Sequence, residues 1–137
     1  MADLLDKTTR ALAASADLRS LRQNVVSANI ANAETPGYTA KKLDFEEALG
    51  RALELEGVGD MKTSNERHFI GGAGSMASVK ADTYDNPDGN MSNDGNTVDM
   101  EKEMSTLAEN SLLYKAAIQL INKKLAALKY AAGEGNR

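Results

Sequence analysis

The two ends of this 137-residue chain carry apolar residues at seven-residue spacing, whereas the middle carries almost none. In the C-terminal segment two such rows run side by side, and they consist of Met100, Leu107, Tyr114, Ile121 and Leu128, and of Met104, Ser111, Ile118 and Leu125. A helix with a narrow apolar stripe cannot bury that stripe alone. The spacing therefore predicts a long helix within residues 96–132 that pairs with another helix.

The N-terminal segment has the same kind of pattern. Its rows consist of Leu4, Ala11, Leu18 and Val25, and of Ala14, Leu21 and Ala28, with Lys7 as the one charged exception. Neither Gly nor Pro interrupts residues 1–33, so nothing breaks a helix there. We expect a mainly α-helical fold in which the two terminal helices pair as a coiled coil.

We further expect the paired stripes to hold the chain in an assembly. Residues on the first helix would face the second helix of the same chain or of neighbouring copies. This predicted assembly seam consists of Leu18, Leu21, Val25, Ala28, Met104, Leu107, Tyr114, Ile118, Ile121, Leu125 and Leu128.

An Asn-rich junction and a turn follow the first helix. The residues of this junction motif are Asn29, Asn32, Thr35, Pro36, Gly37 and Tyr38. Pro-Gly suits the central positions of a type II turn, where Gly takes a positive φ. The Asn amides lie either on a solvated helix surface or against neighbouring backbone where helices pack. Within residues 34–55, Asp44 then has the position of an N-cap for a short helix that ends near Leu55.

The middle of the chain, residues 56–95, holds most of the eleven glycines and few large side chains. Such a stretch buries too little apolar surface to offset the entropy of ordering it. We expect an irregular segment with one short strand over residues 79–84, which could belong to a small hairpin. Because the stripes also lack large residues, the isolated chain should gain helicity on assembly.

Composition excludes several classes of protein. The net charge of −4 is mixed in sign and gives no basic surface for nucleic acid. No apolar run approaches the roughly 20 residues of a membrane-spanning helix, and the first 30 residues lack the pattern of a cleaved signal peptide. The absence of Cys excludes disulfides and thiolate metal sites.

Nothing in the sequence indicates catalysis. His68 has no second titrating group at a useful spacing, so we expect neither an enzyme nor a cofactor. Residues 90–101 match part of the twelve-residue EF-hand spacing, through Asp94, Gly95 and Glu101. However, Asn90 occupies the first ligand position and no entering helix precedes it. We therefore expect no calcium site.

Two separate motifs resemble a known family. Residues 27–38, Ser-Ala-Asn-Ile-Ala-Asn-Ala-Glu-Thr-Pro-Gly-Tyr, resemble the N-terminal signature of bacterial flagellar rod and hook proteins. Residues 41–46 and 94–104, followed by Leu107-Ala108-Glu109-Asn110 and Tyr114, resemble the proximal rod members of that family. Glu34 departs from the pattern, because Asn is common at that position, and the tail after residue 132 extends past the usual end.

The resemblance implies a structural component of the proximal rod of the flagellar basal body, polymerising with other rod proteins for motility and torque transmission. It implies type III export without a cleaved signal, a place on the periplasmic side, and contacts with other rod proteins, with further copies and with the export gate or its adaptor. A soluble coiled-coil adaptor or export chaperone is the alternative. Such a protein would share the heptads but would not need the Thr-Pro-Gly-Tyr junction.

Overall fold

The computed structural model describes residues 6–55, 79, 81–86 and 91–134, and within them it is mainly helical. Helix α1 spans Lys7–Ala31, α2 spans Glu46–Leu55 and α3 spans Met100–Glu134. Two short strands, β1 (Lys41–Asp44) and β2 (Asp82–Asp85), form an antiparallel pair. The predicted mainly α-helical fold with two long terminal helices is confirmed.

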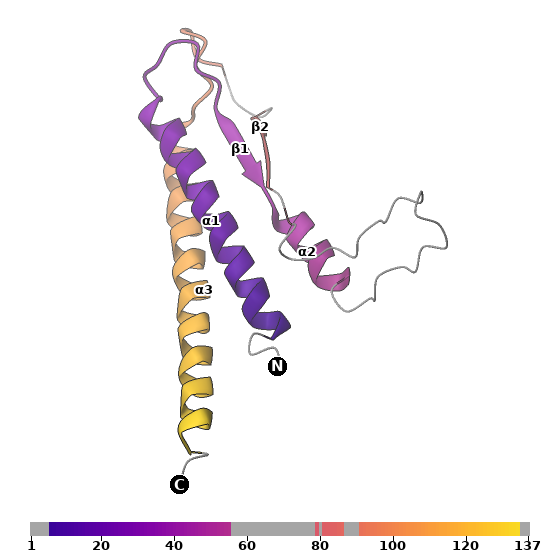
Figure 1. Ribbon diagram of the computed structural model, residues 1–137. Helices are drawn as coiled ribbons and strands as arrows, with labels where there is room; N and C mark the ends of the chain where they lie inside the picture. Colours follow the sequence, from indigo (N-terminus) through magenta and orange to yellow (C-terminus); the bar gives the residue numbers. More distant parts are fainter. Residues whose placement is uncertain (1–5, 56–78, 80, 87–90, 135–137) are drawn as a thin grey trace, which may run out of the picture.

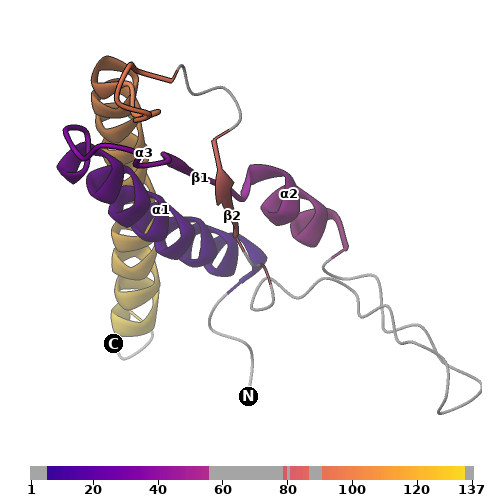
Figure 2. The ribbon, with the colours of Figure 1, turned by 90° about the horizontal axis from the view of Figure 1, so that it is seen from above.

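Helices α1 and α3 lie side by side and run in opposite directions (Figure 1). Seen from above, α1 lies between α3 on one side and the strands with α2 on the other (Figure 2). None of the described helices is long and apolar enough to cross a membrane. The chain thus forms an elongated helix pair with a small side arm of strands and α2.

Helix α1 begins at Asp6, whose side chain accepts hydrogen bonds from the Thr9 backbone N–H at 3.0 Å and from the Thr9 hydroxyl at 2.7 Å. The Asp6 carboxylate also pairs with Lys124 of α3, which fixes where the start of α1 lies along α3. These contacts, the Lys124 hydrogen bond first, lower the pKa of Asp6 to about 2. The predicted beginning of the helix, before Asp6, lies outside the described residues.

Strand β1 was not predicted, whereas a strand near residues 79–84 was. The pairing places Lys41 opposite Asp85 and Asp44 opposite Asp82, and the Asn86 N–H extends it to the Ala40 carbonyl at 2.8 Å. The second strand therefore pairs across the chain with the segment that follows the junction. Residues 56–78, where most of the irregular middle was predicted, lie outside the described residues.

The largest side chain of the core is Phe45, at the start of α2. It is buried with Leu18 of α1 and Leu43 of β1. The guanidinium groups of Arg19 and Arg22 lie over its ring, 5.5 and 4.5 Å from the centroid. Burial of an aromatic ring with stacked cations stabilises such a contact. The core thus joins the side arm to α1 and does not lie between the two long helices.

Helix α3 begins four residues later than predicted. Asp99 precedes its first residue and accepts a hydrogen bond from the Lys102 N–H at 3.1 Å, so Asp99 is the N-terminal cap. Asn96, the first residue of the predicted segment 96–132, has another role that is described below. The helix continues to Glu134, two residues past the predicted end.

Candidate assembly site at the helix junction and along the seam

The junction turns the chain as its sequence predicts. The Tyr38 N–H donates to the Thr35 carbonyl at 3.3 Å, and Gly37, at the third position of this turn, has φ +71°. This is the geometry of a type II turn, in which Gly avoids the strain that a Cβ would introduce. The turn reverses the chain so that β1 runs back along α1.

Asn96 ties the end of α1 to the segment before α3. Its side-chain N–H groups donate to three backbone carbonyls, those of Asn32 and Ala33 at 2.9 Å and that of Thr35 at 2.8 Å. Its side-chain oxygen accepts from the Val98 N–H at 2.7 Å, and the residue is only 2% exposed. The carbonyls at a helix C-terminus have no partners within the helix. Asn32 is the C-terminal cap of α1, and Ala33 and Thr35 follow it in the turn. Asn96 donates to all three carbonyls from 61 to 64 residues further along the chain.

Asn29 makes a similar bridge and is fully buried. Its amide N–H donates to the Lys41 carbonyl at 2.7 Å, while its oxygen accepts from the Lys41 N–H at 3.0 Å and from the Tyr38 hydroxyl at 3.2 Å. The side chain thus takes the place of a neighbouring strand for Lys41. Of the two interpretations of the junction amides, hydrogen bonding to neighbouring backbone is confirmed for Asn29. Asn32 instead donates to the Ala28 carbonyl of its own helix.

Backbone contacts close the junction. The Gly37 N–H donates to the Asp94 carbonyl and the Thr97 N–H to the Tyr38 carbonyl, each at 3.0 Å, so the two segments cross-link in both directions. Gly95 has φ +81°, and a Cβ there would lie 3.5 Å from the Cα of Gly37. Both glycines are therefore required by backbone conformation at this close approach.

The two long helices also meet through polar groups. Asn110 of α3 donates to the Arg19 carbonyl of α1 at 2.8 Å, and its side-chain oxygen is buried without a hydrogen-bond partner among the described residues. Asn110 and Ala117 are the buried residues of α3. Small and polar residues thus occupy the centre of this helix contact, which leaves it weakly apolar.

The predicted assembly seam divides into three groups in the structure. Leu18 is buried, but in the core cluster beside Phe45 and Leu43. The half-buried members are Val25, Leu107, Tyr114, Ile118 and Ile121. The exposed members are Leu21, Ala28, Met104, Leu125 and Leu128. The single chain therefore does not cover its own seam.

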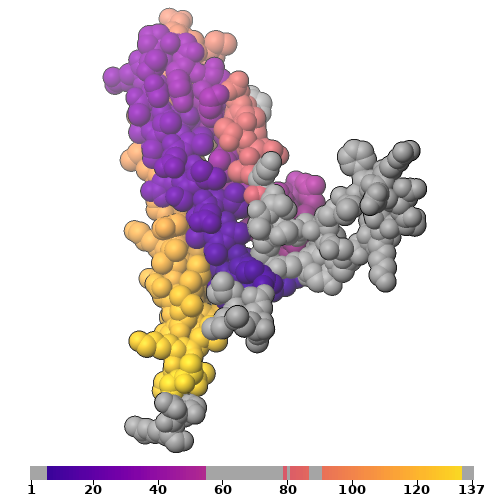
Figure 3. Space-filling view, viewed as in Figure 1, coloured from indigo at the N-terminus to yellow at the C-terminus, as the bar shows by residue number. Residues whose placement is uncertain are grey.

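The exposed members of α3 lie near both ends of the helix. Lys124 is level with the start of α1 at Asp6, and α3 continues past that point to Glu134, about 15 Å at 1.5 Å per residue. Figure 3 shows this yellow end of α3 projecting beyond the indigo start of α1. Leu125 and Leu128, 47% and 38% exposed, continue the stripe where α1 is absent.

A charged cluster lies where α1 meets the side arm. The Arg22 guanidinium donates to both carboxylate oxygens of Glu46, at 2.5 and 2.6 Å, and to the Leu43 carbonyl at 2.9 Å. Burial raises the pKa of Glu46, but the hydrogen bonds from Arg22 and the backbone outweigh it, so the pKa lies below its usual range. This bidentate pair orients α2 against α1.

No group of three or more His, Asp or Glu side chains that could hold a metal ion is found in the described part of the chain. In the loop of the rejected calcium site, Asp94 accepts from the Asn96 N–H at 3.1 Å and so supports the junction. Asn90 and His68 lie outside the described residues. The absence of a calcium site stays a prediction, which titration calorimetry with Ca²⁺ would test.

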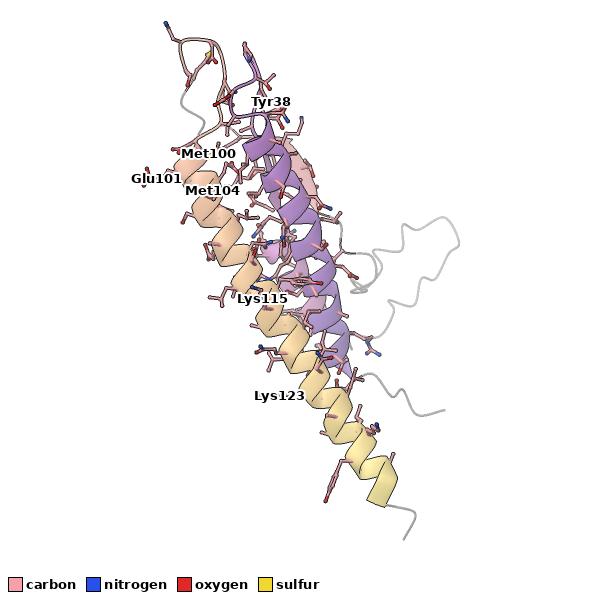
Figure 4. The ribbon with its side chains drawn as sticks, turned by 90° about the vertical axis from the view of Figure 1, so that its left-hand side faces the viewer. Tyr38, Met100, Glu101, Met104, Lys115 and Lys123 are labelled. Atoms are coloured by element: carbon pink, nitrogen blue, oxygen red, sulfur yellow. The ribbon has the colours of Figure 1, made fainter. Side chains whose placement is uncertain are left out.

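Sequence reasoning missed the roles of Asn96 and Asn110, and the contribution of Arg22. Asn110 lies outside both predicted rows, seven residues before the buried Ala117, so the heptad pattern did not single it out. The carbonyl partners of Asn96 are distant in sequence, and no local pattern predicts them. Tyr38, by contrast, was singled out, and Figure 4 shows it at the turn above the end of α1.

Comparison with known proteins agrees with this geometry. Residues 10–39, which cover most of α1 and the turn, match the family of flagella basal body rod proteins. The chain is 37% identical to the flagellar basal body rod protein FlgB of Salmonella typhimurium over 141 aligned positions, covering 99% of this chain and 100% of the relative. It is 40% identical to FlgB of Cereibacter sphaeroides over 114 positions, covering 83% and 84% of the two chains.

A third relative, FlgB of Aeromonas hydrophila, is 38% identical over 111 positions, which cover 81% of each chain. The alignments thus include both long helices and the junction, and the resemblance stated from the sequence motifs is confirmed. The chain belongs to the FlgB family of flagellar basal body rod proteins, which are structural proteins of the bacterial flagellum.

Proposed function

We propose that this chain is a structural subunit of the proximal rod, and that it enters the rod through the exposed part of its assembly seam. The observation that carries this proposal is the uncovered stripe: Leu21, Met104 and Leu125 are each about half exposed, at 50%, 52% and 47%. Leu21 lies on α1 and the other two on α3, and large apolar side chains exposed on a pair of helices favour contact with another protein. Other rod proteins and further copies of this chain would cover them.

The junction is the rigid part of the proposed subunit. The Asn29 and Asn96 bridges hold the end of α1, the turn and the start of α3 together by hydrogen bonds. A subunit in a rod that transmits torque needs a fixed angle between its helices and its side arm. The Arg22–Glu46 pair and the buried Phe45 ring support that angle.

Export and location follow from the same proposal. A rod subunit would leave the cell through the flagellar type III apparatus without a cleaved signal and would contact the export gate or its adaptor. The small core of the described residues supports this, because a helix pair joined through polar residues unfolds at low cost. The subunit would then order on the periplasmic side, where its neighbours cover the stripe.

The test is rod assembly in cells that carry single seam variants. Ile121→Asp places a charge in the half-buried helix contact, where a charge without a partner is costly. Leu21→Asp places one on the exposed stripe of α1. Both should block swimming and rod incorporation, while Ser75→Asp in the middle segment should not.

Export of each variant must be followed separately, so that a secretion defect is not mistaken for a packing defect. If the two seam variants build rods and swim while Ser75→Asp does not, the proposal is wrong. The alternative, a soluble adaptor or export chaperone, makes a different prediction. Such a protein would stay in the cytoplasm bound to export substrates and would be absent from purified basal bodies.

A further inference from the structure

A groove of about 300 Å³ opens between α1, β1 and the first turns of α3. The half-buried Val25 and the nearly buried Val26 and Leu43 form its apolar wall, and Thr106 lies beside them. A space of this size accommodates one or two large side chains, not a whole helix. The groove is therefore shaped to receive side chains that project from a neighbouring element.

The charges around the groove are unequally paired. Asp44 lies 3.6 Å from Arg22 and 3.7 Å from Lys42, and Glu46 is held by the same Arg22. Lys41 pairs with Asp85 at 3.1 Å.

Glu103, the third carboxylate of the groove, pairs with no Lys or Arg of the described residues. Burial raises the pKa of Glu103, although the Asn29 amide and the charge of Lys102 act in the opposite direction. A desolvated carboxylate without an ion-pair partner gains most from an incoming cation.

The other end of the molecule presents the complementary groups. Past Lys124, the exposed stripe of α3 consists of Leu125 and Leu128, and Lys129 follows one residue later. Residues three and four apart lie on one helix face, so the two leucines and the lysine point to the same side. From Lys115 to Lys129 the charged residues of this helix are all basic. This end therefore carries two apolar side chains and a cation. Four basic side chains also line the groove, and three of them, Arg22, Lys41 and Lys42, are paired with carboxylates, so the Lys129 ammonium is complementary to Glu103 in particular.

We propose that the projecting end of α3 docks into the groove of a second copy of this chain, with Leu125 and Leu128 against Val25, Val26 and Leu43, and with the Lys129 ammonium on Glu103. The proposal rests on the proposed function, because it identifies one contact between subunits of the rod. The surfaces that meet are different on the two copies. Such a heterologous contact does not close into a dimer, and it repeats along a ring or helical filament.

Charge reversal tests this pairing directly. Glu103→Lys and Lys129→Glu should each weaken self-association of the full chain by about tenfold or more, since like charges would meet in a partly desolvated contact. The double variant restores opposite charges in swapped positions and should recover most of the affinity. Sedimentation equilibrium over a range of concentrations measures each constant. Lys123→Glu is the matched control, because Figure 4 shows Lys123 on the side of α3 away from α1.

Cysteine cross-linking gives an independent readout, since the chain has no native Cys. A copy with Leu128→Cys mixed with a copy with Lys42→Cys, on the rim of the groove, should form a mixed disulfide dimer under mild oxidation. Replacing the first copy by Lys123→Cys should give little product. Both positions are exposed, so neither change disturbs the fold.

Three results would overturn the proposal: a double variant no better than the single ones, equal weakening by Lys123→Glu, or a wild-type chain that stays monomeric and uncross-linked up to about 1 mM, where even weak contacts are populated. Covering of the stripe by residues 1–5 of the same chain would give the last result. If the chain is found in rods but the reversals do not compensate, the docking fails and the proposed function stands. If the reversals compensate but purified rods lack the chain, the proposed function fails instead.

Discussion

The two ends of the helix pair are built on different principles. At the junction end, buried amides of Asn29 and Asn96 satisfy the backbone of the turn and of the α1 terminus. At the opposite end, the Asp6–Lys124 ion pair joins the start of α1 to α3, and α3 extends past it to Glu134. One end is completed within the chain, and the other exposes an apolar stripe.

This difference separates the part of the subunit that the chain folds by itself from the part that needs a neighbouring subunit. Hydrogen bonds to buried carbonyls are directional and fix the geometry of the junction without a partner. An uncovered apolar stripe is not directional and gains stability only when something else covers it. The junction is thus the folded part of the subunit, and the open end is its assembly part.

The strongest test of the junction is Asn96→Ala. The change removes the side-chain donors to three carbonyls, of which those of Asn32 and Thr35 keep backbone donors, and should destabilise the chain by about 2 kcal/mol, because several part-buried hydrogen bonds are lost together. Urea unfolding followed by circular dichroism measures it. Asn93→Ala, on the exposed loop nearby, should change stability by less than about 0.5 kcal/mol. Equal effects of the two variants would mean that the Asn96 bridges are not formed.

A substitution in the turn should change the stability of the chain less, and its control substitution should change stability in the opposite direction. Gly37→Ala should destabilise the chain by about 1 kcal/mol, because its φ of +71° strains any residue with a Cβ although the space around it is open. Gly50→Ala in α2 meets no neighbouring atom either and keeps a helical conformation, so it should stabilise by about 0.5–1 kcal/mol. Unfolding curves that shift in the same direction would contradict the turn geometry.

The start of α1, at the end away from the junction, should respond to strong acid. The pKa of Asp6 is lowered to about 2, so its ionised form stabilises the folded state above pH 3.8 and this contribution is lost as the pH falls from 3.8 through 2. The carboxylate is exposed, and the effect is therefore small. Amide exchange of the first turn of α1 should rise over this range in the wild type. In Asp6→Asn it should be independent of pH once the intrinsic rate is corrected.

The smallest effect on the isolated chain is expected for Leu125→Asp. The side chain is already about half exposed, so the free energy of unfolding should change by less than about 0.5 kcal/mol. Rod incorporation in cells should nevertheless be lost. A large loss of stability in the purified chain, with normal rods, would reverse the assignment of the open end.

Sequence periodicity predicted the long helices and local chemistry predicted the turn, because both depend on residues close together in the chain. The same pattern did not predict that Leu18 packs with Phe45 in a core beside α1, because heptad spacing says which residues share a face and not which element covers that face. The predicted segment 96–132 also began four residues before α3, because Asn96 and Thr97 are residue types that often cap a helix. The distant carbonyls that Asn96 binds are visible only in the fold.

Hydrogen exchange on the purified chain and on assembled rods tests the central difference most directly. In the dilute chain, we predict protected amides in the last turns of α1 and in the junction, at Gly37 and Thr97, whose N–H groups bond across it. Amides beyond Lys124 should exchange rapidly there and become protected only in the rod. Strong protection of residues 125–134 in the dilute chain, or rapid exchange of the junction amides, would contradict this account.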